Sequence, residues 1–162
     1  MIALRPAVTT DAHIVARIYI ESWNQGFGHL LGMGELTPER VARWEHDLSD
    51  DGVDWTIAEA DGVVVGFVGV GPSRDPVDPM LGELDTIAVD PAHWRVGIGR
   101  ALMNHALAVL RSSWCTAILW TPARYERGHA FYRATGWELL HRTRADGQHV
   151  AFGRDLSVPR SR

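Results

Sequence analysis

The order of strand-like and helix-like segments predicts an α+β fold, with one mixed, mostly antiparallel sheet of about seven strands and helices on both faces. Hairpin signals connect the apolar segments of the first half, whereas strand-like and helix-like segments alternate in the second half. The chain has 162 residues, a usual size for one domain, so we expect residues 1–162 to form a single domain with one core.

The N-terminal part of the sequence is expected to contain one short strand and two helices. Residues 2–5 are strand-like, and the polar caps at residues 9–11 precede a helical pattern that runs to about residue 23. A Gly-Phe-Gly sequence at residues 26–28 should break this helix. The Thr-Pro pair at residues 37–38 supplies a cap and a first helical residue for the second helix.

The middle of the sequence is expected to form a hairpin and a further strand. Residues 54–60 are strand-like, and the Asp-Gly pair at 61–62 suits a two-residue turn because both positions must tolerate a positive φ. The returning strand is expected over residues 63–71. The segment 72–79, rich in proline and aspartate, is expected to be a loop before a strand over residues 81–89.

Helices and strands alternate in the rest of the sequence. An apolar stripe predicts a helix over residues 97–110, and the apolar run at 115–120, which includes Cys115, is consistent with a buried strand. A second helix is expected over residues 125–135, with Gly136 as its C-terminal cap. The last two strands are expected at residues 137–141 and 148–154, joined by a turn at residues 146–147.

The composition narrows the classes of function. With a net charge of −4 and no basic cluster, the chain is a poor candidate for binding nucleic acid. All 16 basic residues are arginine, which excludes Schiff-base chemistry and a lysine-dependent phosphate loop. The eight histidines and the single cysteine show no convincing metal-ligand spacing, so we expect no metal and no internal disulfide.

We expect a cytoplasmic protein that has no membrane contact. No apolar run approaches the ~20 residues that are needed to span a bilayer. The first residues lack the charged and apolar regions of a secretory signal peptide.

Two glycines, Gly97 and Gly99, stand where a strand is followed by a helix. A phosphate can approach bare backbone there, and the first N–H groups and the dipole of the helix favour an anion. Arg95 and Arg100 add guanidinium groups that suit phosphate oxygens. A dinucleotide-binding loop would have a third glycine at the position of Leu102. The spacing alone leaves a phosphate site and an ordinary turn as alternatives.

The sequence around this loop is more specific. A strand that ends in Val-Asp-Pro at 89–91 leads into Trp-Arg-Val-Gly-Ile-Gly-Arg-Ala at 94–101, and residues 127–137 contain Phe-Tyr followed by Gly-Trp. These segments resemble the acetyl-CoA motif and the second motif of the GNAT family of N-acetyltransferases. The resemblance covers nearly the whole chain, with two departures: Trp94 stands at the family's Gln/Arg position, and Tyr125 stands where an asparagine is common.

The resemblance implies acetyl-CoA as acyl donor and a role for each matching residue. Tyr132 matches the tyrosine that protonates the departing CoA thiolate, a task that suits a phenol with a reference pKa near ~10. The strand at Ile87, Ala88 and Val89 would bind the pantetheine arm through its backbone. The pyrophosphate would be wrapped by Arg95, Val96, Gly97, Ile98, Gly99, Arg100 and Ala101.

Two carboxylates are candidates for the general base that takes the proton of the attacking amine. Along a regular strand, Glu83 and Asp85 would share one face with Ile87 and Val89. The resemblance agrees, because a carboxylate on this strand often serves as base. We slightly favour Glu83, and a bulge in the strand would reverse the register. A solvated carboxylate pair is the alternative.

The acceptor pocket is expected at the glycine-broken end of the first helix. Trp23, Asn24 and Phe27 lie there, and their aromatic rings could line a pocket or pack in the core. The leading hypothesis is an enzyme that moves acetyl to a primary amine of a small molecule by direct attack in a ternary complex. The alternatives are a catalytically silent acyl-CoA sensor and an acetyltransferase for protein or peptide amines. Homodimers are common among similar proteins.

Overall fold

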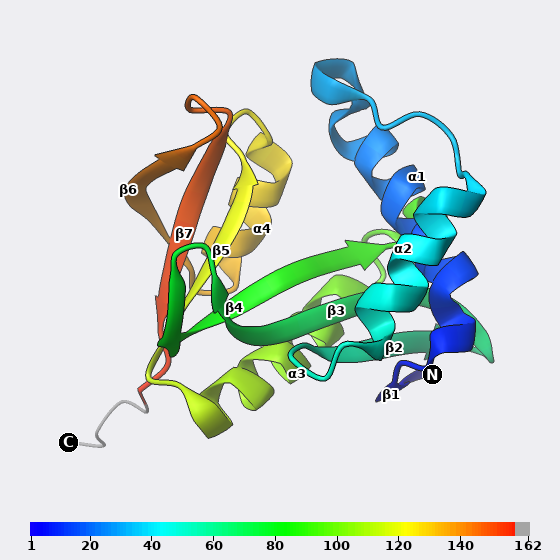
Figure 1. Cartoon of the computed structure of the whole chain (residues 1–162), viewed down its shortest axis with the longest axis horizontal. Helices are drawn as coiled ribbons and strands as arrows, with labels where there is room; N and C mark the ends of the chain where they lie inside the picture. Colours follow the sequence, from blue (N-terminus) through cyan, green and yellow to red (C-terminus); the bar gives the residue numbers. More distant parts are fainter. Residues whose placement is uncertain (158–162) are drawn as a thin grey trace.

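The computed structural model describes residues 1–157, and it describes the side chains of these residues except at positions 29–31. One sheet has the strand order β1-β2-β3-β4-β5-β7-β6, and among the described strands only β4 and β5 are parallel neighbours. Helices α1 and α2 cover one face, and α3 and α4 cover the other (Figure 1). The predicted fold class is therefore confirmed.

In chain order the elements are β1 (Ile2–Pro6), η1 (Thr9–Asp11), α1 (Ala12–Leu31), α2 (Pro38–Ser49), β2 (Asp54–Ala60), β3 (Val63–Arg74), β4 (Val77–Val89), η2 (Pro91–His93), α3 (Ile98–Ser113), β5 (Thr116–Pro122), α4 (Glu126–Ala134), β6 (Glu138–Arg144) and β7 (His149–Asp155).

Turns and caps with a local chemical cause lie where the sequence predicts them. Asp61 and Gly62 have φ values of 51° and 79° in the turn between β2 and β3. The Thr37 hydroxyl accepts a hydrogen bond from the Arg40 N–H at the start of α2. Gly136 has a φ of 92° just after α4, as a C-terminal cap requires.

The segment 72–79 is not the loop that the sequence suggests. β3 continues to Arg74, β4 begins at Val77, and Asp75-Pro76 is the turn between them. The three prolines are tolerated because Pro76 lies in the turn, while Pro72 and Pro79 stand at the register shift, where a missing N–H costs little. The hairpin therefore reaches farther along the sheet than expected.

Helix α1 is longer than its periodic pattern. Phe27 has non-helical dihedral angles, φ −145° and ψ 23°, so the Gly-Phe-Gly sequence kinks the helix instead of ending it. Asp11 makes no cap hydrogen bond with its side chain, because its carboxylate accepts from Arg5 and from the Val8 N–H. No helix among residues 1–157 combines the length and the apolar character needed to cross a membrane.

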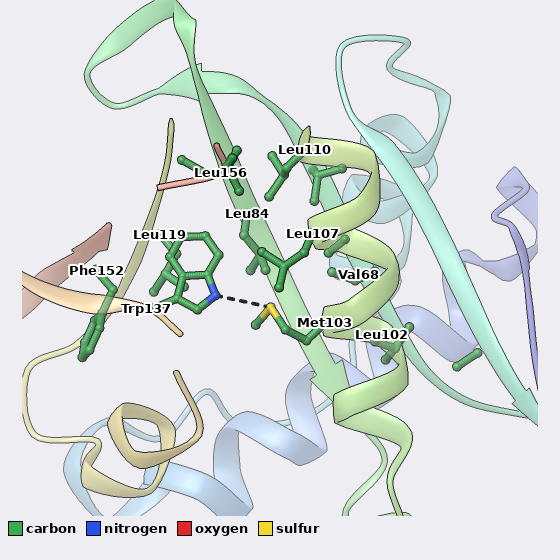
Figure 2. Packing of buried hydrophobic residues seen from close by; sticks show 14 of the residues in the cluster. Val68, Leu84, Leu102, Met103, Leu107, Leu110, Leu119, Trp137, Phe152 and Leu156 are labelled. Atoms are coloured by element: carbon green, nitrogen blue, oxygen red, sulfur yellow. Dashed lines mark hydrogen bonds between the residues drawn. The ribbon is translucent and has the colours of Figure 1, made fainter. Parts of the chain in front are cut away.

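The larger core lies between α3 and the sheet. Leu102, Met103 and Leu110 of α3 are fully buried there, and the Trp137 indole donates a hydrogen bond to the Met103 sulfur at 3.4 Å (Figure 2). This packing fixes α3, and with it the loop that precedes the helix. Cys115 corrects the expectation of a buried thiol, because β5 begins one residue later and the cysteine is exposed.

Candidate active site

A cleft of about 740 Å³ opens where the central sheet splits. β4 and β5 pair only at Gly82 with Ala117 and at Glu83 with Ile118, and beyond these residues the two strands diverge. Figure 1 shows β4 turning toward α1 while β5 stays beside β7 and α4. The cleft is lined by α1, β4, the loop before α3, β5, α4 and the start of β7.

The C-terminal part of β4 presents to this cleft a backbone edge that has no partner strand among the described strands. The Asp90 N–H donates to Val65 on the β3 side, so the Val89 carbonyl of the same peptide points to the cleft side. The N–H and C=O of one strand residue face the same edge, so the groups of Ile87 also face the cleft. Among the described strands, no partner pairs with this edge. An extended ligand arm can add to it as a strand would.

The loop before α3 has the geometry of an anion site. Gly97 is the N-cap of α3 with a φ of 92°, which favours glycine, and Arg95 has a positive φ of 63°. A Cβ at Gly99 would approach Phe131 only to 3.6 Å, an ordinary contact. Packing within the protein therefore does not require glycine at position 99. The first N–H groups of α3 have no intrahelical partner.

Unpaired positive charge gathers around this loop. Arg95, Arg100 and Arg127 line the cleft, and within the described part of the chain none of them forms an ion pair. The Arg127 guanidinium lies 4.1 Å from the centre of the Trp94 ring. The Trp94 indole in turn donates a hydrogen bond of 2.7 Å to the Val89 carbonyl. Sequence reasoning missed Arg127, and its partner Trp94 was noted only as a departure from the family pattern.

Tyr132, on α4, lines the cleft. Its ring packs against Phe131 and Phe152, with centroid distances of 5.7 Å in each case. Burial of the phenol raises the pKa of Tyr132 above its usual value, and nearby Tyr125 raises it further, whereas a hydrogen bond with Thr121 lowers it. The hydroxyl is therefore protonated at neutral pH and is able to donate a proton.

A β-bulge in β4 separates the two candidate carboxylates. Two consecutive β3 residues pair with Thr86 and Leu84, which leaves Asp85 as an extra residue. Leu84 and Ile87, three positions apart, both pack toward α3 for this reason. The expectation that Glu83, Asp85 and Ile87 share one regular face is therefore wrong, because the bulge reverses the alternation.

The carboxylates consequently have different surroundings. Asp85 lines the cleft, where it pairs with Arg74 and accepts a hydrogen bond of 3.0 Å from the Thr86 hydroxyl. Glu83 is buried outside the cleft lining, and it accepts a hydrogen bond of 2.8 Å from the Arg74 N–H. Burial raises the pKa of Glu83. The structure thus brings Asp85, and not Glu83, to the cleft.

A row of aromatic rings crosses the other end of the cleft. Trp23 stacks edge-on with Phe27 at 4.1 Å, and Phe27 meets Tyr125 of the α4 N-cap at 4.7 Å. A Cβ at Gly128 would overlap the Tyr125 ring, and one at Gly26 would lie only 3.0 Å from its hydroxyl. These two glycines make room for the contact between α1 and α4. Trp23 and Phe27 therefore line the cleft while they also pack against each other, which combines the two alternatives that the sequence leaves open.

Asn24 does not join them. Its amide donates a hydrogen bond of 2.9 Å to the Gly34 carbonyl, and its carbonyl oxygen accepts one of 2.8 Å from the Met33 N–H. The side chain is exposed and holds the connection between α1 and α2, outside the lining of the cleft.

A family profile described as the acetyltransferase (GNAT) family matches residues 13–137, which include the split strand pair, the glycine loop and α4. The chain belongs to the GNAT family. It is 31% identical over 113 residues to phosphinothricin N-acetyltransferase of Streptomyces viridochromogenes, a match that covers 65% of this chain and 57% of the relative. Mycothiol acetyltransferase of Kocuria rhizophila is 30% identical over 125 residues, or 75% of this chain and 33% of the relative. The chain thus spans less than two thirds of either relative.

Solved structures of other acetyltransferases share the fold. An acetyltransferase from Thermus thermophilus superposes with a TM-score of 0.79 at 18% identity, and the match covers 96% of this chain and 97% of that one. The putative acetyltransferase yncA from Salmonella typhimurium, solved with acetyl-CoA, has a TM-score of 0.74 at 18% identity, with 99% and 96% coverage. At this level of identity the likeness concerns the fold.

Proposed function

We propose that this protein is an acetyl-CoA-dependent N-acetyltransferase that moves an acetyl group to the primary amine of a small molecule. The observation that carries the proposal is the free β4 edge next to a glycine loop with unpaired arginines. The edge suits the amide-bearing arm of coenzyme A, and the loop suits its phosphates. The two curated relatives carry N-acetyltransferase or acetyltransferase names, which agrees with this assignment.

Each part of the cleft then has a task toward the donor. The backbone groups of Ile87 and the N–H of Val89 hold the pantetheine arm in an extended form, while the Val89 carbonyl accepts from the Trp94 indole. The helix N-terminus and the residues from Arg95 to Ala101 wrap the pyrophosphate, because unpartnered N–H groups and guanidinium groups suit phosphate oxygens. Ala88 points its side chain to the opposite core and contributes only backbone.

A small acceptor is favoured by the contact between α1 and α4. Phe27 and Tyr125 meet across the end of the cleft at 4.7 Å, so the acceptor end is bridged. A protein acceptor would need an open groove for an extended chain. The names of the two curated relatives also specify small molecules, phosphinothricin and mycothiol.

We assign Asp85 as the general base and Tyr132 as the general acid. An ammonium group has no lone pair for attack on a thioester, so a carboxylate beside the acceptor must take its proton. Asp85 lines the cleft and Glu83 does not, which reverses the preference drawn from a regular strand. Tyr132 is protonated at neutral pH and lines the same cleft, so its hydroxyl can reach a departing CoA thiolate.

The proposal is tested by thiol release from acetyl-CoA across a panel of primary amines. Asp85→Asn should lower kcat/KM by about 100-fold or more at neutral pH, because the loss of a general base costs this much. The matched variant Glu83→Gln should stay within about threefold of the wild type, since it lies outside the cleft. The reverse order of the two effects would assign the base to Glu83.

Tyr132→Phe should lower kcat by about 100-fold or more while the Kd of CoA, measured by calorimetry, stays nearly constant. Unchanged kcat at saturating acetyl-CoA would remove the assigned acid role. Tight binding of acetyl-CoA without thiol release for any amine would instead support a silent acyl-CoA sensor.

A further inference from the structure

Tyr19 is a partly buried titratable residue of the cleft that the mechanism proposed above does not use. Its ring packs against Trp44 of α2 at a centroid distance of 5.4 Å, and against Trp23, one turn later on α1, at 5.9 Å. Two indoles from two helices thus restrict the orientation of the ring, as close packing does in a protein interior. The phenol is therefore held in one place in the lining of the cleft.

The hydroxyl group of Tyr19 has no hydrogen-bond partner in the described part of the chain. The hydrogen bond that reaches Tyr19 from the Ser22 hydroxyl is accepted by the backbone carbonyl and not by the phenol. The phenolic oxygen is also not one of the fully buried polar atoms that lack a partner, so a ligand can reach it. Because a phenol both donates and accepts hydrogen bonds, this group is available to a molecule in the cleft.

The phenol lies close to the Asp85 carboxylate. β4 turns toward α1 (Figure 1), and Tyr19 packs against the core cluster that contains Ala88 of the same strand. Tyr19 and Asp85 both line the cleft. Burial raises the pKa of Tyr19 above its usual value, and the negative charge of Asp85 raises it further. The hydroxyl is therefore neutral at pH 7 and lies within reach of the charge of the carboxylate.

Two arginines of α2 act on the same phenol in the opposite direction. Arg43 and Arg40 lower the pKa of Tyr19, each less strongly than Asp85 raises it. Neither arginine lines the cleft. Of the charged groups that act on this phenol, Asp85 is therefore the one that an acceptor in the cleft would contact.

From this arrangement we propose that Tyr19 is a further acceptor-binding residue, whose hydroxyl oxygen accepts a hydrogen bond from the amine while Asp85 takes a proton from it. The inference rests on the proposed function and adds a specificity-determining residue to that site. A primary ammonium has three N–H donors, so it can donate to the carboxylate and to the phenol at once. After one proton has moved from the nitrogen to Asp85, an N–H that still donates to Tyr19 keeps the amine oriented for attack.

Tyr19→Phe tests this role, because it removes the hydroxyl and keeps the ring between the two indoles. Thiol release is measured with the whole chain, acetyl-CoA and phenethylamine, a primary amine whose ring suits an aromatic lining. We expect the KM for phenethylamine to rise about tenfold, since a hydrogen bond to a charged group is lost. The kcat and the KM for acetyl-CoA should change by less than about threefold, because the lost contact is made with the acceptor before and during transfer.

Ser22→Ala is the matched control on the same helix. Its hydroxyl already donates to the Tyr19 carbonyl at 3.1 Å, so its loss should leave the KM for phenethylamine within about twofold. An unchanged KM for phenethylamine in Tyr19→Phe, or an equal rise in Ser22→Ala, would overturn the inference. A rise confined to the KM for acetyl-CoA would also overturn it. In each of these cases turnover would still uphold the proposed N-acetyltransferase, whereas no thiol release by the wild type with any amine would remove that function itself.

Discussion

Trp94 stands at the position where the family motif has a glutamine or arginine, and its contacts with neighbouring residues accommodate this difference. The indole N–H satisfies the Val89 carbonyl at the end of the free β4 edge, and the ring carries the Arg127 guanidinium on its face. Where the family pattern has a glutamine or arginine, this chain thus has an aromatic ring that holds an arginine of another helix beside the loop. We propose that Arg127 is one of the residues that bind the phosphates of the donor.

The phosphate role of Arg127 predicts a defect that depends on the donor. Arg127→Ala should raise the KM for acetyl-CoA by about tenfold, because one charge-assisted contact is lost, and should leave kcat nearly constant. Acetyl-pantetheine lacks the phosphates, so its KM should not change. Arg133→Ala is the matched control on the same helix, since Arg133 lies over Phe152 and not in the cleft lining. An equal effect on both donors would contradict the assignment.

If Tyr132 acts as the proposed general acid, its raised pKa sets the alkaline side of the pH profile. A phenol normally loses its proton near pH ~10, and burial moves this loss to higher pH. Turnover should rise with pH as the acceptor ammonium becomes neutral, without a fall below about pH 10 from the loss of the acid. A descending limb between about pH 8 and 9 that Tyr132→Phe abolishes would contradict this account, and initial rates at saturating acetyl-CoA would reveal it.

At the scale of elements, the contact between kinked α1 and α4 decides the shape of the acceptor end. Gly128 faces the Tyr125 ring so closely that a Cβ would overlap it. Alanine is normally the better helix residue. Whether Gly128→Ala raises or lowers the stability of the protein therefore depends on the Tyr125 ring beside it.

Gly128→Ala should lower the free energy of unfolding by about 1–3 kcal/mol, because overpacking outweighs helix propensity. In a Tyr125→Ala background the same substitution should raise stability by up to about 1 kcal/mol, since only the propensity gain remains. Denaturant unfolding of the four proteins measures both signs. A change in unfolding free energy of the same sign with Tyr125 and with Tyr125→Ala would show that the ring does not oppose the added methyl group.

Features that are determined by neighbouring residues could be predicted from the sequence. Features that depend on residues far away in the sequence could not. The turn at Asp61-Gly62 and the cap at Thr37 follow from the residues themselves. The bulge at Asp85 has no signal of its own, because it is set by the register with β3. The hairpin at Asp75-Pro76 was hidden by prolines that usually indicate a loop, although the strands tolerate them at a turn and a register shift.

The residues of the candidate site likewise fall into those that the sequence indicates and those that depend on distant contacts. The glycine loop, Tyr132 and the aromatic residues of α1 follow from motif and pattern. The choice of Asp85 over Glu83 depends on the bulge, and the position of Arg127 depends on a ring that lies in a different element. Asn24 was misplaced because its side chain hydrogen-bonds to the backbone of Gly34 and Met33, and the sequence pattern carries no signal of these contacts.

For the molecule as a whole, the split between β4 and β5 determines where the cleft lies. One continuous sheet supplies a rigid frame, and the gap in its middle leaves a backbone edge free. The anchored α3 places unpaired N–H groups and arginines at one end of this gap, while aromatic rings of α1 and of the start of α4 line the other end. Donor and acceptor are thus expected to enter from different ends and to meet beside Tyr132.

The most direct test of this account is a crystal structure of the protein with coenzyme A. The pantetheine amides should hydrogen-bond to the backbone of Ile87 and Val89, and the pyrophosphate should lie at the N-terminus of α3. The thiol should end near the Tyr132 hydroxyl. Coenzyme A bound elsewhere, or bound with the β4 edge still unpaired, would contradict the central claim that the split in the sheet is the donor site.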